Sequence, residues 1–184
     1  MQRSFKKRIQ GAVLCLCCLL VASLLLHCEN VPAAEKFKPF KLKTLDGTTK
    51  RLQDYSNKAV LVMFLFPKCA YCNIALPEVL KMYDTYKDQG LSVVSINVMP
   101  DQNKLIPDWQ TKYHVTFPVL IGASQNSLMD DYQLTATPTF YLLGEKGEVL
   151  FRQSKYERGD EKTMDAKIAD ALKIIHNAAV VQKP

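Results

Sequence analysis

VLVMFLFPKCAYC, residues 60–72, carries an apolar run directly into a pair of cysteines, Cys69 and Cys72. The unbroken run predicts a central strand covered on both faces, and the second cysteine falls in the first turn of a helix that follows it. A sulfur at a helix N-terminus lies beside unpaired backbone N–H groups and the positive end of the helix dipole, which favours thiolate over thiol. Because the thiolate is the form that attacks disulfides, we interpret the pair as a dithiol/disulfide couple.

The composition is that of one folded domain with an N-terminal extension. The chain has 184 residues, 48% of them hydrophobic, and its seven glycines and nine prolines are scattered. Residues 1–34 hold Arg3, Lys6, Lys7 and Arg8 against Glu29, which makes +3 of the formal net charge of +6. The other +3 is spread without a basic block, so no nucleic-acid partner is expected. We expect a monomer.

The first 34 residues have the pattern of an export signal. A basic segment, residues 3–8, precedes an apolar stretch from Ile9 to Leu26, and small residues follow at 33–34. Three fates are open: cleavage near Ala33 or Ala34, retention as a membrane anchor, or lipid attachment at Cys28. The 18 apolar residues are at the lower limit for crossing a bilayer. For lipid attachment, His27 stands where a small residue is expected.

All three fates place residues 35–184 outside the cytoplasm, in the bacterial periplasm or at the outer face of the cytoplasmic membrane. We therefore divide the chain into a signal peptide or membrane anchor, residues 1–34, and one domain, residues 35–184. Only two of the six cysteines, Cys69 and Cys72, belong to this domain, because Cys15, Cys17, Cys18 and Cys28 lie in or beside the leader. An extracytoplasmic chain with a single CxxC has no framework of structural disulfides.

Strand and helix patterns alternate along the domain. Asp46-Gly47 predicts a hairpin near the start. Buried strands are predicted at 59–66 and 91–98, a short one at 117–121, and an antiparallel pair at 139–143 and 148–152 around Gly144-Glu145-Lys146-Gly147. Helices are predicted after Cys72 up to Gly90, within 101–114, at 127–132 and from Gly159 onward. This order predicts an α/β sheet with helices on both faces.

Two of the predicted helices have a marked apolar spacing. The helix after Cys72 shows it at Ile74, Val79, Leu80, Tyr83 and Tyr86, with Pro77 predicting a kink. The last helix turns Met164, Ile168, Leu172 and Ile175 inward. Pro107 lies inside the segment 101–114, where Leu105, Trp109 and Tyr113 recur every four residues.

This order of elements resembles the thioredoxin fold, and specifically the TlpA/ResA-like extracytoplasmic thiol–disulfide oxidoreductases. The resemblance covers about residues 37–175. It is carried by Phe40 to Gly47, Val60 to Cys72, Pro77, Tyr113 to Val119, Thr137 to Phe140 and Gly159 to Lys162. It implies a central mixed β-sheet, an N-terminal β-hairpin, and an inserted helix after the unit of CxxC helix and strand. A Thr-Pro some 65 residues after the CxxC makes the match specific.

The resemblance also implies roles for the site residues. Cys69 would be the attacking sulfur, more exposed and lower in pKa, and Cys72 the thiol that resolves the mixed disulfide. Pro138, preceded by Thr137, matches the family's cis-proline, whose loop packs against the CxxC and helps to exclude metals. The backbone of Thr137 would pair with an extended substrate segment. A trans-proline at the start of an edge strand is the alternative.

Four further positions modify this expectation. Lys68 stands where the family usually has Trp, and a cation there favours the thiolate and a more oxidising couple, unless it points into solvent. Tyr71, between the thiols, contacts substrate or covers Cys72. The buried acid that commonly accepts the proton of the resolving thiol is absent, because Ala75 and Met63 occupy its two usual positions.

Metal binding is not expected of this domain. A zinc site needs three or four ligands, and His114 and His176 are its only histidines. His114 is expected on the surface at a helix end, His176 on the solvated face of the last helix, and Trp109 in the core. No cofactor is expected.

We expect an enzyme that exchanges disulfides with protein substrates outside the cytoplasm. By analogy with the family, its substrates would include apocytochrome c thiols awaiting haem, with electrons delivered by a membrane thiol carrier. A thiol peroxidase is one alternative, since Phe66-Pro67-Lys68 resembles the start of the peroxiredoxin motif, although Phe66 stands where that motif needs Thr or Ser. A copper-delivery protein is another, although such carriers space their cysteines more widely and add a His. The redox direction and the natural partner are left open.

Overall fold

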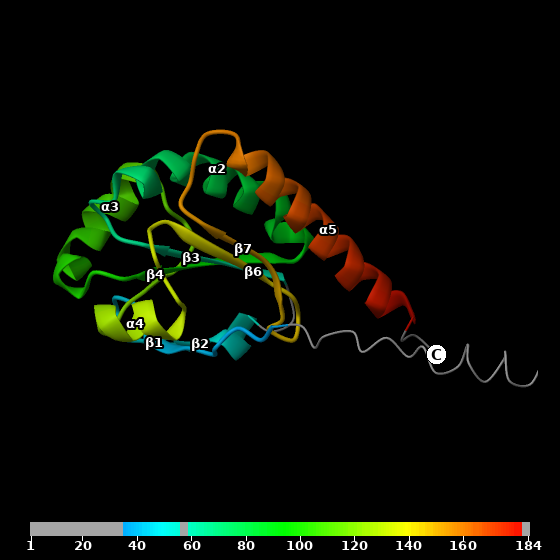
Figure 1. Ribbon diagram of the computed structural model, residues 1–184, viewed down its shortest axis with the longest axis horizontal. Helices are drawn as coiled ribbons and strands as arrows, with labels where there is room; N and C mark the ends of the chain where they lie inside the picture. Colours follow the sequence, from blue (N-terminus) through cyan, green and yellow to red (C-terminus); the bar gives the residue numbers. More distant parts are fainter. Residues whose placement is uncertain (1–34, 56–58, 182–184) are drawn as a thin grey trace, which may run out of the picture. The chain divides into compact units, whose positions relative to one another are not determined.

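Five strands form a mixed sheet in the order β5-β4-β3-β6-β7 (Figure 1). The computed structural model describes residues 35–55 and 59–181, with side chains up to Lys173. The strands are β3 (Ala59–Leu65), β4 (Leu91–Asn97), β5 (Val119–Leu120), β6 (Thr139–Leu143) and β7 (Val149–Ser154). β3, β4 and β5 run parallel to one another, whereas β6 and β7 run antiparallel to their neighbours. Every residue of β3 is buried, as its continuous apolar pattern predicts.

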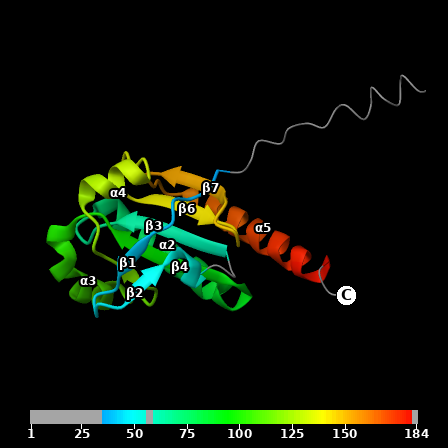
Figure 2. The same cartoon turned by 90° about the horizontal axis from the view of Figure 1, so that it is seen from below.

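Helices cover both faces of this sheet. One face carries α2 (Ala70–Tyr86) and α5 (Asp160–Val181), and the other carries α4 (Gln125–Asp131) (Figure 1). The hairpin of β1 (Lys41–Lys43) and β2 (Thr49–Arg51) lies on the α4 side, in front of the sheet in Figure 2. The remaining helical segments are η1 (Leu52–Tyr55), η2 (Lys87–Gln89), η3 (Pro100–Leu105) and α3 (Ile106–Tyr113). The predicted α/β architecture is confirmed.

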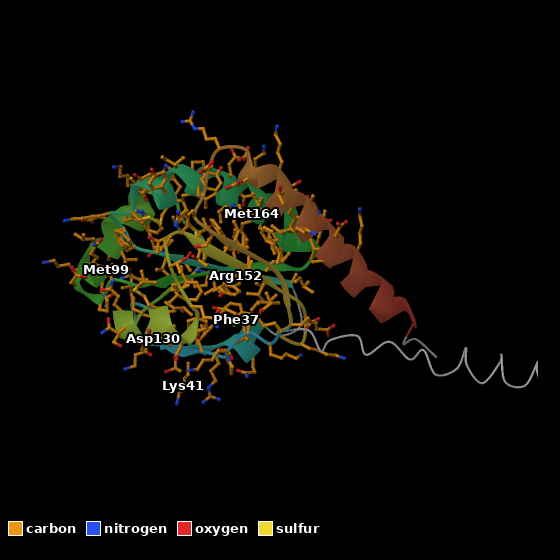
Figure 3. The ribbon with its side chains drawn as sticks, viewed as in Figure 1. Phe37, Lys41, Met99, Asp130, Arg152 and Met164 are labelled. Atoms are coloured by element: carbon orange, nitrogen blue, oxygen red, sulfur yellow. A yellow bond between two sulfur atoms is a disulfide. The ribbon has the colours of Figure 1, made fainter. Side chains whose placement is uncertain are left out.

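Alternation along β3 divides the interior into two cores. Leu61, Met63 and Leu65 face α2, α3 and α5, whereas Val62 and Phe64 face α4 and the N-terminal segment. Figure 3 shows the same division at two labelled side chains, because Met164 of α5 and Phe37 lie on opposite sides of the sheet. Met164, Ile168 and Leu172 are buried as predicted.

The segment before β1 is pinned to the β6–β7 hairpin. Phe37 N donates to the carbonyl of Gly147 at 2.9 Å, and Val149 N donates to that of Glu35 at 2.8 Å. The Phe37 ring stacks on Tyr132 with centroids 4.9 Å apart. Burial, followed by the nearby charge of Asp131, raises the pKa of Tyr132 to about 12. Residues 35–40 therefore belong to the folded domain.

Several predicted elements differ in their bounds; the strand predicted at 148–152, for example, is Val149–Ser154. The helix predicted within 101–114 consists of η3 followed by α3, because Pro107 cannot donate inside a helix but fits the first turn of a new one. The strand predicted at 117–121 is only Val119–Leu120. The helix predicted at 127–132 starts two residues earlier, since Ser124 caps it by accepting from Ser127 N at 3.2 Å.

The apolar face of α2 also differs from its predicted pattern. Ile74 is 46% exposed, and the buried residues of α2 are instead Cys72, Ala75, Leu76, Val79 and Met82. The helix does not end at Pro77, and Gly90 stops the segment after η2 with a φ of 110°.

The leader predicted over residues 1–34 and the side chains of Ile175 and His176 lie outside the described residues. Within the described part of the chain, no helix has both the length and the apolar character needed to cross a membrane.

Candidate active site

The two cysteines lie where β3 gives way to α2. β3 ends at Leu65, a short turn follows, and α2 begins at Ala70 with Cys69 as its N-cap. Cys69 and Cys72 form a disulfide, with an S–S distance of 2.07 Å and a Cα–Cα distance of 5.2 Å. Cys72 N donates to Cys69 Sγ at 3.1 Å, so this sulfur accepts one of the otherwise unpaired N–H groups of the first turn. The predicted position of the pair is confirmed.

The two sulfurs differ in access. Cys69 is 5% exposed and Cys72 is fully buried. The residues around them are open to solvent: Lys68 is exposed, and Tyr71 is 62% exposed. The predicted contact of Tyr71 with substrate stays a prediction. Cys69 is therefore the more exposed of the two cysteines, by a small margin.

The loop before β6 brings Thr137 and Pro138 to the first sulfur. The Thr137–Pro138 peptide bond is cis, as the resemblance implies. Thr137 Oγ1 lies 3.5 Å from Cys69 Sγ, although 68 positions separate the two in the sequence. β3 and β6 are antiparallel neighbours, so the last residues of β3 lie beside the first residues of β6. This pairing places the Thr-Pro loop beside the disulfide.

An apolar groove of about 120 Å³ adjoins this loop. Val98 and Met99 line it where the chain leaves β4, and Figure 3 labels Met99 at that end of the molecule. Its other lining residues are Phe66, Gln125, Met129, Leu134, Ala136 and Thr137. Thr137 therefore connects this apolar groove to Cys69.

A set of hydrogen bonds around the cysteines was not predicted. Trp109 Nε1 donates to Asn73 Oδ1 at 2.8 Å, and Asn73 Nδ2 donates to the carbonyl of Pro67 at 3.1 Å. Lys68 N donates to Gln102 Oε1, also at 3.1 Å. Trp109 is 5% exposed, as expected of a core residue. No sequence pattern links it to Asn73, 36 positions away.

The positions of the missing acid are occupied by packed apolar side chains. Ala75 and Met63 are both fully buried in the core on the α2 side of the sheet. Among the described residues, the buried polar side chains are Ser95, Asn97 and Thr139, none of them an acid. Ser95 pairs with Met63 in the sheet, and within this part of the chain its buried Oγ has no hydrogen-bond partner.

The described residues hold no group of three or more His, Cys, Asp and Glu side chains that could bind a metal ion. His114 is exposed at the C-terminal end of α3, where its φ of 54° ends the helix. It is therefore a surface residue at a helix end, as predicted.

Comparison with known proteins agrees with this geometry. Residues 33–152 match the model of the AhpC/TSA family. The chain belongs to the AhpC/TSA family. Within this family, it is 28% identical over 118 residues to the thiol-disulfide oxidoreductase ResA of Halalkalibacterium halodurans, a match that spans 64% of this chain and 66% of ResA. It is 35% identical over 122 residues to the thioredoxin-like protein YneN of Bacillus subtilis, spanning 65% of this chain and 70% of YneN.

Solved structures share the fold of this AhpC/TSA chain. A putative thiol:disulfide interchange protein DsbE from Chlorobium tepidum superimposes with a TM-score of 0.69 at 22% identity, covering 76% of this chain and 96% of that one. StoA from Bacillus subtilis gives 0.57 at 22% identity, covering 71% and 96%. The thioredoxin-like fold is thereby confirmed. The similarity to ResA and YneN also agrees with the predicted resemblance to ResA-like proteins.

Proposed function

We propose that this AhpC/TSA protein acts outside the cytoplasm and exchanges disulfides with protein substrates through Cys69 and Cys72. The observation that carries the proposal is a disulfide-bonded sulfur pair at a helix N-terminus, with its more exposed member 3.5 Å from the Thr137 hydroxyl. The aligned stretches span about two thirds of the curated relatives, so substrate and partner are argued from this chain. The basic and apolar segments within residues 1–34 support export.

The exchange proceeds in two steps. The Cys69 thiolate attacks a substrate disulfide, forms a bond to one substrate sulfur and releases the other as a thiolate. The Cys72 thiolate then attacks Cys69, closes the Cys69–Cys72 bond and releases the second substrate sulfur. Two electrons pass from the pair to the substrate, and the two protons of the pair end on the released substrate thiols. The opposite direction runs when the partner couple has the lower reduction potential, so that its thiols reduce the Cys69–Cys72 disulfide.

Burial supports this division of roles. Cys69 is the more exposed cysteine, at 5%, and its sulfur already accepts the N–H of Cys72, which is the contact that stabilises a thiolate. Cys72 is fully buried, so it can reach a sulfur bonded to Cys69 but not a free substrate. The backbone of Thr137, beside the cis-proline, is the proposed pairing edge for an extended substrate segment.

Two finer assignments follow from the family resemblance. We propose that the substrates include apocytochrome c thiols, and that a membrane thiol carrier supplies the electrons. In this setting the leader is cleaved near Ala33 or Ala34, retained as a membrane anchor, or modified by lipid attachment at Cys28. Mass spectrometry of the protein from a membrane fraction separates these three outcomes.

The function is tested by insulin reduction with dithiothreitol as the electron source. We expect the protein to accelerate it, Cys69→Ser to abolish the acceleration, and Cys72→Ser to accumulate a mixed disulfide visible on a non-reducing gel. Peroxide consumption and Cu(I) titration on the same samples test the peroxidase and copper-delivery alternatives. Full insulin-reducing activity in Cys69→Ser would refute the proposal. The glutathione equilibrium of the pair then fixes the redox direction.

A further inference from the structure

The segment inserted between β4 and β5, which consists of η3 and α3, contacts both ends of the CxxC loop. Before the first cysteine, the backbone N–H of Lys68 donates to Gln102 Oε1 at 3.1 Å. After the second cysteine, Asn73 Oδ1 accepts from Trp109 Nε1 at 2.8 Å. Gln102 belongs to η3 and Trp109 to α3. The insertion thus holds the two residues that flank the cysteine pair.

Asn73 joins these contacts into one arrangement. While its Oδ1 accepts from Trp109, its Nδ2 donates to the carbonyl of Pro67 at 3.1 Å. A side-chain amide both donates and accepts, so this single group connects the turn before Cys69, the first turns of α2, and α3. Trp109 is 5% exposed. Water therefore competes little for its hydrogen bond.

The insertion is anchored where it leaves the sheet. Asn97, at the end of β4, donates from Nδ2 to the carbonyl of Met99 at 2.8 Å and to Asn103 Oδ1 at 2.7 Å. Gln102 N donates to the carbonyl of Met99 at 2.9 Å. Ile106 is fully buried in the core beneath α2. Gln102 and Trp109 therefore act from a fixed support rather than from a free loop.

We propose that Gln102 and the Asn73–Trp109 pair are positioning residues that hold the Cys69 sulfur over the N-terminus of α2 and so stabilise its thiolate. The inference deepens the proposed function and rests on it. When the disulfide is reduced, the bond that keeps the two sulfurs together is lost. The field of a helix end falls off within one turn. The Cys72 N–H and the helix dipole then stabilise Cys69 only if the turn before it stays in place.

Loosening this turn changes the Cys69 pKa and the redox equilibrium in a definite direction. A sulfur that moves away from the helix end loses stabilisation of its charged form, so the pKa of the Cys69 thiol rises. The reduced form of the couple is then less stable relative to the disulfide, and the couple becomes more reducing. The net contribution of one such hydrogen bond corresponds to a rise of about half a unit to one unit in the Cys69 pKa. The equilibrium with glutathione shifts by roughly threefold to tenfold.

The test uses Gln102→Leu and Trp109→Phe, each of which removes one hydrogen bond and keeps similar bulk. Gln110→Leu is the matched control. Gln110 lies on α3 next to Trp109, and its side chain makes no hydrogen bond within the described residues. The readouts are the pH profile of Cys69 alkylation by iodoacetamide in the reduced protein, the disulfide equilibrium with glutathione, and the melting temperature. We expect both test variants to shift the pH profile upward and the equilibrium toward disulfide, with the control unchanged.

A fall in melting temperature with an unchanged pH profile and equilibrium in both test variants would overturn the inference, since it would leave these residues a structural role only. Gln102 is half-exposed, so its variant remains informative if Trp109→Phe folds poorly. None of these readouts needs a protein substrate. Failure of insulin reduction in the parent protein counts against the proposed function, and an unshifted pH profile counts against the positioning role.

Discussion

At the scale of single residues, Cys69 joins the start of a helix to redox chemistry. Its sulfur accepts the N–H of Cys72 at the N-cap of α2, a place where Ser, Thr, Asp or Asn is usual. In the disulfide this contact satisfies a backbone donor, and in the dithiol the same contact stabilises the thiolate. The residue that begins the helix is therefore also the residue whose charge that helix favours.

Lys68 has a smaller electrostatic effect on this sulfur than the helix end has. Its side chain is exposed, so water and salt screen its charge. We expect Lys68→Ala to raise the pKa of the Cys69 thiol by only a few tenths of a unit at low salt, and by nothing measurable at about 1 M salt. The backbone N–H that donates to Gln102 is retained in this variant. A salt-independent shift measured by iodoacetamide alkylation would contradict this screened-charge account.

Ala75 offers a test of the missing acid. It lies three residues after Cys72, on the buried face of α2, and is fully buried. Ala75→Glu should lower the melting temperature, because it adds bulk and a buried carboxyl to a packed core. Burial raises the pKa of this carboxyl in the folded state. The variant is therefore most stable below about pH 4, where the carboxyl is protonated, and its stability falls as pH rises through the raised pKa.

The matched control for that variant is Ala75→Gln, which has the same size and no charge. We expect the pH–rate profile of insulin reduction to gain an ionisation in Ala75→Glu that the Gln variant lacks. Identical profiles for the two would show that a carboxyl at this position does not exchange protons with Cys72.

The cysteine pair and the proline loop were accessible to sequence reasoning, whereas the contacts of Asn73 were not. A CxxC after an apolar run predicts a sulfur at a helix start by local rules alone, and Pro138 follows from the family resemblance. Asn73 and Gln102 are ordinary polar residues in sequence. Their bonds to Trp109 and Lys68 join positions more than 30 apart. Only the folded insertion brings these groups together.

At the scale of secondary-structure elements, the two central strands of the sheet were predicted correctly because their apolar runs are long. β3 and β4 agree with prediction within one residue. Short elements fare worse, since capping and proline rather than periodicity set their ends. Ser124 moves the start of α4, and Pro107 divides the insertion into η3 and α3. Ile74 shows a further limit, because an apolar residue next to a binding site can face solvent.

The cap of α4 should matter for the groove beside Thr137. Ser124 Oγ accepts from Ser127 N at 3.2 Å, and α4 carries Gln125 and Met129, which line that groove. We expect Ser124→Ala to destabilise the protein by about 1 kcal/mol and to speed amide hydrogen exchange in α4. Ser124→Asp, which restores an acceptor, is the control and should recover most of the loss. Equal stability of all three proteins would show that α4 does not depend on this cap.

At the scale of the whole domain, the fold begins before its first strand. Phe37 and Phe40 are 6% and 5% exposed. The carbonyl of Glu35 and the N–H of Phe37 bond to the β6–β7 hairpin. This agrees with a domain starting at residue 35, although that boundary stays a prediction. The sequence did not indicate that this arm packs on the β6–β7 hairpin, because its aromatic residues lie in a polar stretch. The ring partners of Phe37, Tyr132 and Tyr141, come about 100 positions later.

Phe37→Ala in the full chain measures what this arm contributes. Removing a buried ring from contact with Tyr132 and Tyr141 should cost about 3 kcal/mol of stability. It should also let water reach Tyr132, so the pKa of that phenol falls from about 12 toward its ordinary value near 10. Alkaline titration of tyrosine absorbance follows the second effect independently of unfolding by denaturant.

Lys41→Ala, an exposed change on the adjacent β1, is the control. If Phe37→Ala left both the unfolding free energy and the Tyr132 titration unchanged, residues 35–40 would be a passive linker, and a protein cleaved at any point before Lys41 would fold equally well.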